Sequence, residues 1–307
     1  MSLRALTACA LGLALSASVL AQSAIAPAPQ RFFDDFSQAS VSALSQQGWM
    51  VRTAAGHPGV PGARWSAEGL SLVRDPQAPG QQWLRLSART DGTPEGTQQT
   101  QLCQPRKFLE GTYAARVRFT DTPVQGDDGD PVIQTFYAVS PLKHDFDPEF
   151  SEIDWEFLPN GGWGSPVPRL YGITWQTVRL EPWLAFNDKF ELPEVKAGWH
   201  TLVVQVMGGQ TRWFVDGRPV GQHGGRNYPV VPMALSFNLW FSPGGLLPPS
   251  ATPRVYEQDV DWVLHVRQAA LSPEQVELEV QRLRQSGHAT LDTLPPASTE
   301  LAHRCDF

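Results

Sequence analysis

Three carboxylates recur at every second position of one short segment, Ser151-Glu-Ile-Asp-Trp-Glu-Phe-Leu158. The alternation predicts a β-strand in which Glu152, Asp154 and Glu156 face one way and the intervening apolar side chains face the core. Three like charges in a row push at least one pKa upward. Stability alone gives no reason for such a row, so it indicates a function. The alternatives are a metal site, which would more naturally add ligands from a loop, and a solvated acidic strand.

Two carboxylates with separated pKa values are what cleavage of a glycosidic bond needs. One must be ionised to attack the sugar carbon, and the other must hold a proton for the leaving oxygen. Four residues of strand span about 13 Å. If Glu152 and Glu156 lean together, we expect their carboxyl groups to approach the roughly 5–5.5 Å of a retaining pair. Asp154 lies between them and would tune both by hydrogen bonding.

A second segment, Met233 to Phe241, is predicted to form a wall of a sugar site. Its apolar side chains alternate onto one face, and the other face carries Asn238 and Trp240. An amide can bond sugar hydroxyls and an aromatic ring can stack on a sugar. The alternative for Trp240 is a rim or core aromatic.

Three more residues are candidates for contact with a sugar. Trp163 and Trp175 are candidates for the groove, although each is as consistent with a packing role, because the 11 Trp residues cannot all be ligands. His200 begins a predicted strand and is a candidate for a hydrogen bond near the site. A satisfied structural histidine is the equal alternative.

The elements that must position these residues are predicted to be almost all strands. Alternating segments separated by Gly, Pro, Asp and Asn clusters run from about residue 31 to 268. Strands are expected at 83–88, 113–119, 200–206, 211–215, 218–221, 233–241 and 260–266. Strands at this spacing without intervening helices predict one antiparallel β-sandwich or jelly roll as a single domain, 31–268.

The C-terminal piece, residues 269–307, differs in pattern. The pattern predicts a helix start in which Ser272 can cap, Pro273 takes the first helical position and Gln275 completes a capping box. Apolar residues at helical spacing follow, and Gly287 is a plausible stop. We expect a helix that packs on the outside of the sandwich, then a loose tail unless Cys305 pins it.

Five segments, in order along the chain, resemble glycoside hydrolase family 16, the laminarinase, lichenase and xyloglucan-transglycosylase relatives. Glu152-Ile-Asp-Trp-Glu156 resembles the family's E-x-D-x-E signature. The resemblance covers roughly residues 32–266. The other matching segments are Gly111-Thr-Tyr-Ala-Ala-Arg-Val-Arg118, Trp199-His-Thr201 with Arg212-Trp-Phe-Val-Asp-Gly217, Asn238-Leu-Trp240 and Val260-Asp-Trp-Val263.

The resemblance implies a concanavalin A-like β-jelly roll and a retaining double displacement. Carried over by position, Glu152 would be the nucleophile, Asp154 the helper and Glu156 the general acid/base. It also implies cleavage of internal β-linkages of a polysaccharide, with β-1,3- or β-1,3/1,4-glucan as the leading substrate. The alternatives are another β-glycan, transfer to a sugar acceptor, and a carbohydrate-binding protein without catalysis.

The N-terminus predicts export. Residues 1–21 have a short positive start, an apolar stretch and a small-x-Ala cleavage site, which is typical of a secretory signal peptide, and residues 22–30 look like a spacer. We expect a secreted or periplasmic monomer without a membrane span. The formal net charge of −7 argues against a nucleic-acid partner.

Export also bears on cysteines and cofactors. In an oxidising compartment, Cys103 and Cys305 are as consistent with a disulfide that ties down the tail as with two separate thiols. Asp127-Asp-Gly-Asp130 could suggest calcium, which some family members bind, but its spacing fits no EF-hand loop and a polar turn is favoured. No cofactor is expected.

Overall fold

The computed structural model describes residue 1 and residues 29–75, 78, 80–194, 197–298 and 304–305. The predicted signal peptide therefore lies outside the described residues apart from Met1, and of the predicted spacer only residues 29 and 30 are described. In the described part, no helix is long and apolar enough to cross a membrane.

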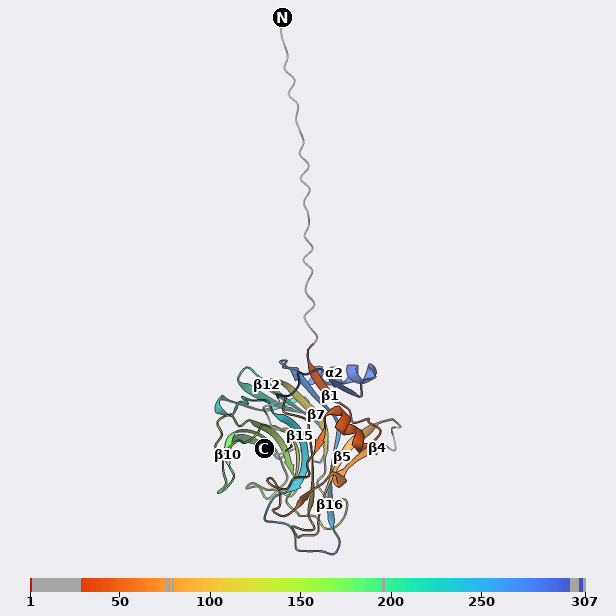
Figure 1. The fold of residues 1–307 in the computed structure, drawn as a ribbon, viewed down its shortest axis with the longest axis vertical. Helices are drawn as coiled ribbons and strands as arrows, with labels where there is room; N and C mark the ends of the chain where they lie inside the picture. The colour runs from red at the N-terminus through yellow and green to blue at the C-terminus, as the bar shows by residue number, and fades with distance from the viewer. Residues whose placement is uncertain (2–28, 76–77, 79, 195–196, 299–303, 306–307) are drawn as a thin grey trace.

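Two curved β-sheets pack face to face, which confirms the predicted jelly-roll sandwich (Figure 1). One sheet, called sheet B, forms the floor of the site described below. In spatial order its strands are β11 (Leu184–Leu192), β10 (Arg169–Arg179), β9 (Glu152–Leu158), β8 (Val132–Val139), β15 (Ala234–Phe241), β6 (Gln98–Cys103) and β2 (Met50–Val51).

The opposing sheet, called sheet A, is built around the long strand β16 (Arg254–Arg267). On one side of β16 follow β7 (Gly111–Phe119), β12 (Gly198–Met207), β13 (Gln210–Val215) and β14 (Arg218–Gly224). On the other side lie β5 (Gln82–Thr90) with β4 (Leu70–Arg74), and β1 (Arg31–Asp34) with β17 (Thr290–Asp292). The short β3 (Arg64–Trp65) runs parallel to β6.

The core between the sheets holds the apolar side chains that alternate with the carboxylates of β9. Ile153, Trp155 and Phe157 are all buried there. The ring of Trp155 packs edge-on against that of Trp213 from sheet A, with 4.9 Å between the ring centroids. Because this face of β9 is held in the core, its other face must point away from it.

The C-terminal helix has the predicted boundaries. Helix α2 (Pro273–Gln285) begins with the Ser272–Gln275 capping box and packs Val276, Val280 and Leu283 against sheet A. It lies beside β1 in Figure 1. A shorter helix, α1 (Val41–Leu44), and three 3₁₀ turns, Ser45–Gln47, Ala67–Gly69 and Gly225–Asn227, connect strands.

The tail after α2 is more ordered than the expectation of a loose tail allowed. Residues 290–292 form β17, which adds to the edge of sheet A beside β1. Cys305 forms a disulfide with Cys103 on β6, with 2.13 Å between the sulfur atoms. The tail is thus attached at two points, and the tentative disulfide is present.

Candidate active site

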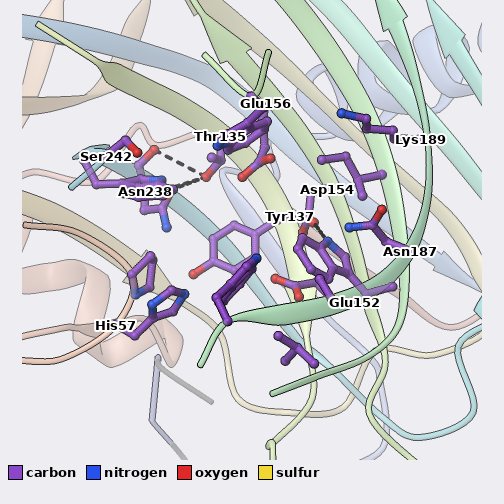
Figure 2. Close-up of a pocket in the computed structure, with 18 of the residues that line it drawn as sticks. His57, Thr135, Tyr137, Glu152, Asp154, Glu156, Asn187, Lys189, Asn238 and Ser242 are labelled. Carbon is purple, nitrogen blue, oxygen red and sulfur yellow. Dashed lines mark hydrogen bonds between the residues drawn. The ribbon is translucent and has the colours of Figure 1, made fainter. Parts of the chain in front are cut away.

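A cavity of about 530 Å³ lies over the face of sheet B that points away from the core. Its floor comes from the adjacent strands β11, β10, β9, β8 and β15, so the cavity spans five neighbouring strands. Loops and the tail form its edges. This cavity, hereafter the cleft, contains the three carboxylates of β9 (Figure 2).

The carboxylates sit in the middle of the sheet because β9 pairs on both sides. Glu152, Asp154 and Glu156 lie opposite Trp175, Ile173 and Tyr171 of β10. On the other side they lie opposite residues 139, 137 and 135 of β8. Asp154 is 3% exposed and Glu156 9% exposed, whereas Glu152 is half-buried. The solvated-strand alternative does not fit this burial.

Hydrogen bonds favour the charged form of the middle carboxyl group. The indole Nε1–H of Trp175 donates to Asp154 Oδ2 over 2.5 Å. The interaction between the neighbouring Glu152 and Asp154 side chains also lowers the pKa of Asp154 and raises that of Glu152. Asp154 Oδ1 and Glu156 Oε2 are buried, and neither atom accepts a hydrogen bond from the protein. Buried acceptors of this kind are costly unless a ligand supplies donors.

Burial is the main cause that raises the pKa of all three carboxyl groups. The pKa of Glu152 is raised further by the charges of Asp154 and Glu156. The bond from Trp175 partly offsets the raised pKa of Asp154, and Lys189 partly offsets that of Glu156. Three neighbouring carboxyl groups whose pKa values are all raised disfavour the state in which all three are ionised.

The predicted wall residues of β15 line the cleft as expected. Asn238 and Trp240 point into it, and the alternating apolar residues of β15 point into the core. The hydroxyl of Thr135 hydrogen-bonds Asn238 Oδ1, which fixes the amide and leaves its Nδ2 end to face a ligand. Trp240 Nε1 has no protein acceptor. Both predicted tryptophans, Trp163 and Trp175, also line the cleft.

His200 does not line the cleft, so its expected role near the sugar is corrected. It lies on β12 of sheet A, and its Nδ1 is 2.7 Å from a carboxylate oxygen of Asp216. Its ring also packs near Phe119. The alternative of a satisfied structural histidine is the one that the structure supports.

Sequence reasoning missed several cleft residues. Asn187 and Lys189 come from β11, which was not predicted, although Ala185, Asn187 and Lys189 alternate as one face of a strand. Figure 2 shows Asn187 and Lys189 on one side of the carboxylates and Tyr137 and Asn238 on the other. Other missed residues include His57, Pro58, Trp183 and Cys305, which come from loops and the tail and carry no periodic signal.

The acidic turn that raised the question of calcium is occupied by protein contacts. Asp130 forms a buried ion pair with Arg254, with 2.6 Å between Nε and Oδ2. Asp128 accepts a hydrogen bond from Asn160. Within the described residues there is no group of three or more His, Cys, Asp or Glu side chains placed to hold a metal ion.

Comparison by sequence finds no matching family model and no matching curated protein. Comparison of the fold with solved structures does find similar proteins. A lichenase, a prokaryotic β-1,3-1,4-glucanase from a mouse hindgut metagenome, aligns with a TM-score of 0.53 and 20% identity over 77% of this chain and 99% of its own. A family 16 endo-glucanase from Bacteroides ovatus aligns with 0.56 and 14% identity over 76% and 98%.

An endo-β-1,3-glucanase from Pyrococcus furiosus aligns with a TM-score of 0.53 and 19% identity over 77% of this chain and 95% of its own. The chain has the fold of the family 16 glycoside hydrolases. This confirms the fold that the five segments predicted. At such identities the likeness concerns the fold, and the chemistry must be argued from the cleft.

Proposed function

We propose that the protein is a retaining glycoside hydrolase that cleaves β-linkages of a glucan. The observation that carries this is the row Glu152, Asp154 and Glu156, of which the last two are buried, on the floor of a cleft lined with aromatic rings. Catalysis accounts for a row of repelling carboxylates better than binding does, since a binding protein gains nothing from the repulsion. The similar folds named above belong to glucanases, which supports a glucan as substrate.

In this proposal Glu152 is the nucleophile. The Glu152–Asp154 pair carries one negative charge, and Trp175 stabilises it by donating to Asp154. When the proton of the pair rests on Asp154, the Glu152 carboxylate is free to attack the anomeric carbon, and a covalent glycosyl-enzyme forms. Asp154 thus acts by holding the proton that would otherwise neutralise the nucleophile.

Glu156 serves as the general acid and then as the general base. Burial is the main cause that raises its pKa, so it can hold a proton for the leaving oxygen. After the leaving group departs with that proton, the Glu156 carboxylate takes a proton from water. The resulting attack on the anomeric carbon releases the sugar and restores Glu152, with retained configuration.

The substrate proposed is β-1,3- or mixed β-1,3/1,4-glucan. Trp163, Trp175 and Trp240 offer rings to sugar faces, and Asn238 offers an amide to hydroxyls. We also propose that the protein is exported, because a disulfide such as Cys103–Cys305 is typical of proteins in oxidising compartments. This agrees with the signal-peptide pattern of residues 1–21.

The test is release of reducing ends from laminarin, lichenan, barley β-glucan, xyloglucan, agarose and carrageenan. We expect activity on laminarin or on the mixed-linkage glucans, and loss of at least a thousandfold in Glu152→Gln. Glu149→Gln is the matched control, because Glu149 is exposed and pairs with Lys143 outside the cleft. NMR of the first product anomer tests retention.

Two outcomes would redirect the proposal. Activity that survives in Glu152→Gln would refute the assigned nucleophile. If no polymer is cleaved, while wild type and Glu152→Gln are retarded equally by the same polymers in affinity gels, the protein binds carbohydrate without hydrolysing it.

A further inference from the structure

Two aromatic rings from opposite edges of sheet B meet over the cleft. His57 lies in the segment after β2, at one edge, and Trp183 lies in the turn between β10 and β11, at the other. Five strand-to-strand steps separate β2 from β10, or about 24 Å in a flat sheet. The two rings are nevertheless stacked, with 5.3 Å between their centroids and 26° between their planes. The contact therefore joins the two edges across the sheet.

The strand register shows which part of the floor lies between the two origins of this contact. The segment leaves β2 with a backbone hydrogen bond to the carbonyl oxygen of Gln101. Through the pairings of β6, β15, β8 and β9, Gln101 stands in the same row as Glu156. The ring of Trp183 contacts that of Trp175, which is directly opposite Glu152. A connection from the level of Glu156 at one edge to the level of Glu152 at the other passes over the carboxylate row.

The segment after β2 is held at this level by hydrogen bonds to β6. The buried guanidinium of Arg52 donates to the carbonyl oxygen of His57 over 2.9 Å and to Gln101 Oε1 over 3.1 Å. Where the segment returns, the backbone N–H of Val60 donates to Gln99 Oε1 over 3.3 Å. Charge-assisted hydrogen bonds from a buried group make the segment a built part of the cleft.

The ring of Trp183 is placed by the site itself. It packs edge-on against Trp175, with 6.1 Å between the ring centroids, and Trp175 donates to Asp154. Trp183 is 52% exposed, so part of the ring faces solvent, yet both Trp183 and His57 line the same cavity as the carboxylates. The cavity therefore lies between the stacked rings and the floor of sheet B.

We infer that the His57–Trp183 contact is a roof over the carboxylates and that it restricts the substrate to unbranched stretches of glucan. The floor of sheet B, the segment after β2 and the β10–β11 turn then surround the chain. A backbone of single sugar units can pass beneath the two rings, whereas a unit with a side branch must bring the branch past them. An open groove has nothing above the carboxylates that a branch could meet. This inference rests on the proposed function and narrows its substrate class.

The experiment compares kcat/KM on a linear hexasaccharide and on the same backbone with one glucosyl branch at O6 of each central unit. The backbone is laminarihexaose or a mixed β-1,3/1,4 hexasaccharide, whichever the wild-type full chain cleaves. We expect the branches to lower kcat/KM of the wild type at least tenfold, because they overpack the space under the roof. Trp183→Ala and His57→Ala each remove one ring of the contact, and each should reduce this penalty to less than threefold. Because the readout is a ratio, a uniform loss of affinity cancels.

Phe186→Ala is the matched control, because Phe186 is an exposed aromatic of the same hairpin that does not line the cleft. It should keep the full penalty. A wild-type penalty below threefold would overturn the roof while leaving the proposed hydrolase intact, since the linear sugar is still cleaved. A full penalty that persists in both Trp183→Ala and His57→Ala would assign the rejection to the floor and would also overturn the roof. Failure to cleave either linear hexasaccharide would overturn the proposed function and this inference with it.

Discussion

The hydrogen bond from Trp175 to Asp154 gives the sharpest test of the proposed chemistry. Replacing Trp175 by Phe keeps an aromatic ring in the cleft but removes the Nε1–H that donates to Asp154 Oδ2. Asp154 is buried, and its other oxygen has no further protein hydrogen bond. A hydrogen bond to a charged group contributes about 1.5–3 kcal/mol. That is the amount by which the negative charge on the Glu152–Asp154 pair should be destabilised.

The sign follows from which protonation state loses the bond. The Nε1–H points at the Glu152–Asp154 pair and stabilises its single negative charge, so its removal raises the pKa of the pair and favours the doubly protonated state, in which the nucleophile is neutral. On the acidic limb of the pH profile, kcat/KM should fall by about 10- to 150-fold, since 1.36 kcal/mol corresponds to a factor of ten. The limb should move to higher pH, and the two enzymes should converge in alkaline solution.

The assay is kcat/KM from pH 4 to 9 on whichever glucan the wild type cleaves. Trp163→Phe is the control, because it makes the same change in the same cleft away from the Trp175–Asp154 bond. It should alter KM without moving the acidic limb. A Trp175→Phe profile with its limb at the wild-type pH, or a uniform loss at every pH, would refute the claim that Trp175 acts through the charge of Asp154.

Three further predictions concern stability. Glu156→Gln should raise Tm by roughly 2–6 °C at pH 7.5 and by less at pH 5. The reason is that a carboxyl group whose pKa is raised on folding destabilises the folded state as pH rises. An equal change in Tm at both pH values, measured by calorimetry, would contradict this. Dithiothreitol should lower the free energy of unfolding of the wild type by about 2–4 kcal/mol in urea unfolding, because the disulfide closes a loop between positions 202 residues apart. It should leave the stability of a Cys103→Ala/Cys305→Ala variant unchanged. Equal responses of the two proteins would argue against the bond. Ser272→Ala should lower the free energy of unfolding by about 1 kcal/mol through loss of the helix cap. It should leave kcat/KM intact, since α2 packs on sheet A. A large loss of activity would show that α2 is coupled to the cleft.

The local alternation of residues was enough to predict much of this protein. In β9 and β15 a polar face and an apolar face follow from a period of two, so the carboxylate row, Asn238 and Trp240 could be assigned to one surface before any fold was known. The caps of α2 are equally local. These features are determined by the sequence because each depends on neighbours within a few residues.

Only the tertiary structure decided which distant segments meet at the cleft. Strand β15 lies between β8 and β6, and that order brings Asn238 and Thr135 together from positions 103 residues apart. Histidine is a residue type common in functional sites, but His200 lies on sheet A, away from the cleft. The rings of His57 and Trp183 meet because both edges of sheet B curve over one face.

The raised pKa values of the carboxyl groups are also decided by the fold, because desolvation depends on everything packed around β9 rather than on its own sequence. The row of carboxylates is evident from the sequence of residues 152–156 alone. The meeting of His57, Trp183 and Cys305 at the same cleft is not, because long-range pairing and loop closure leave no periodic signal in the chain.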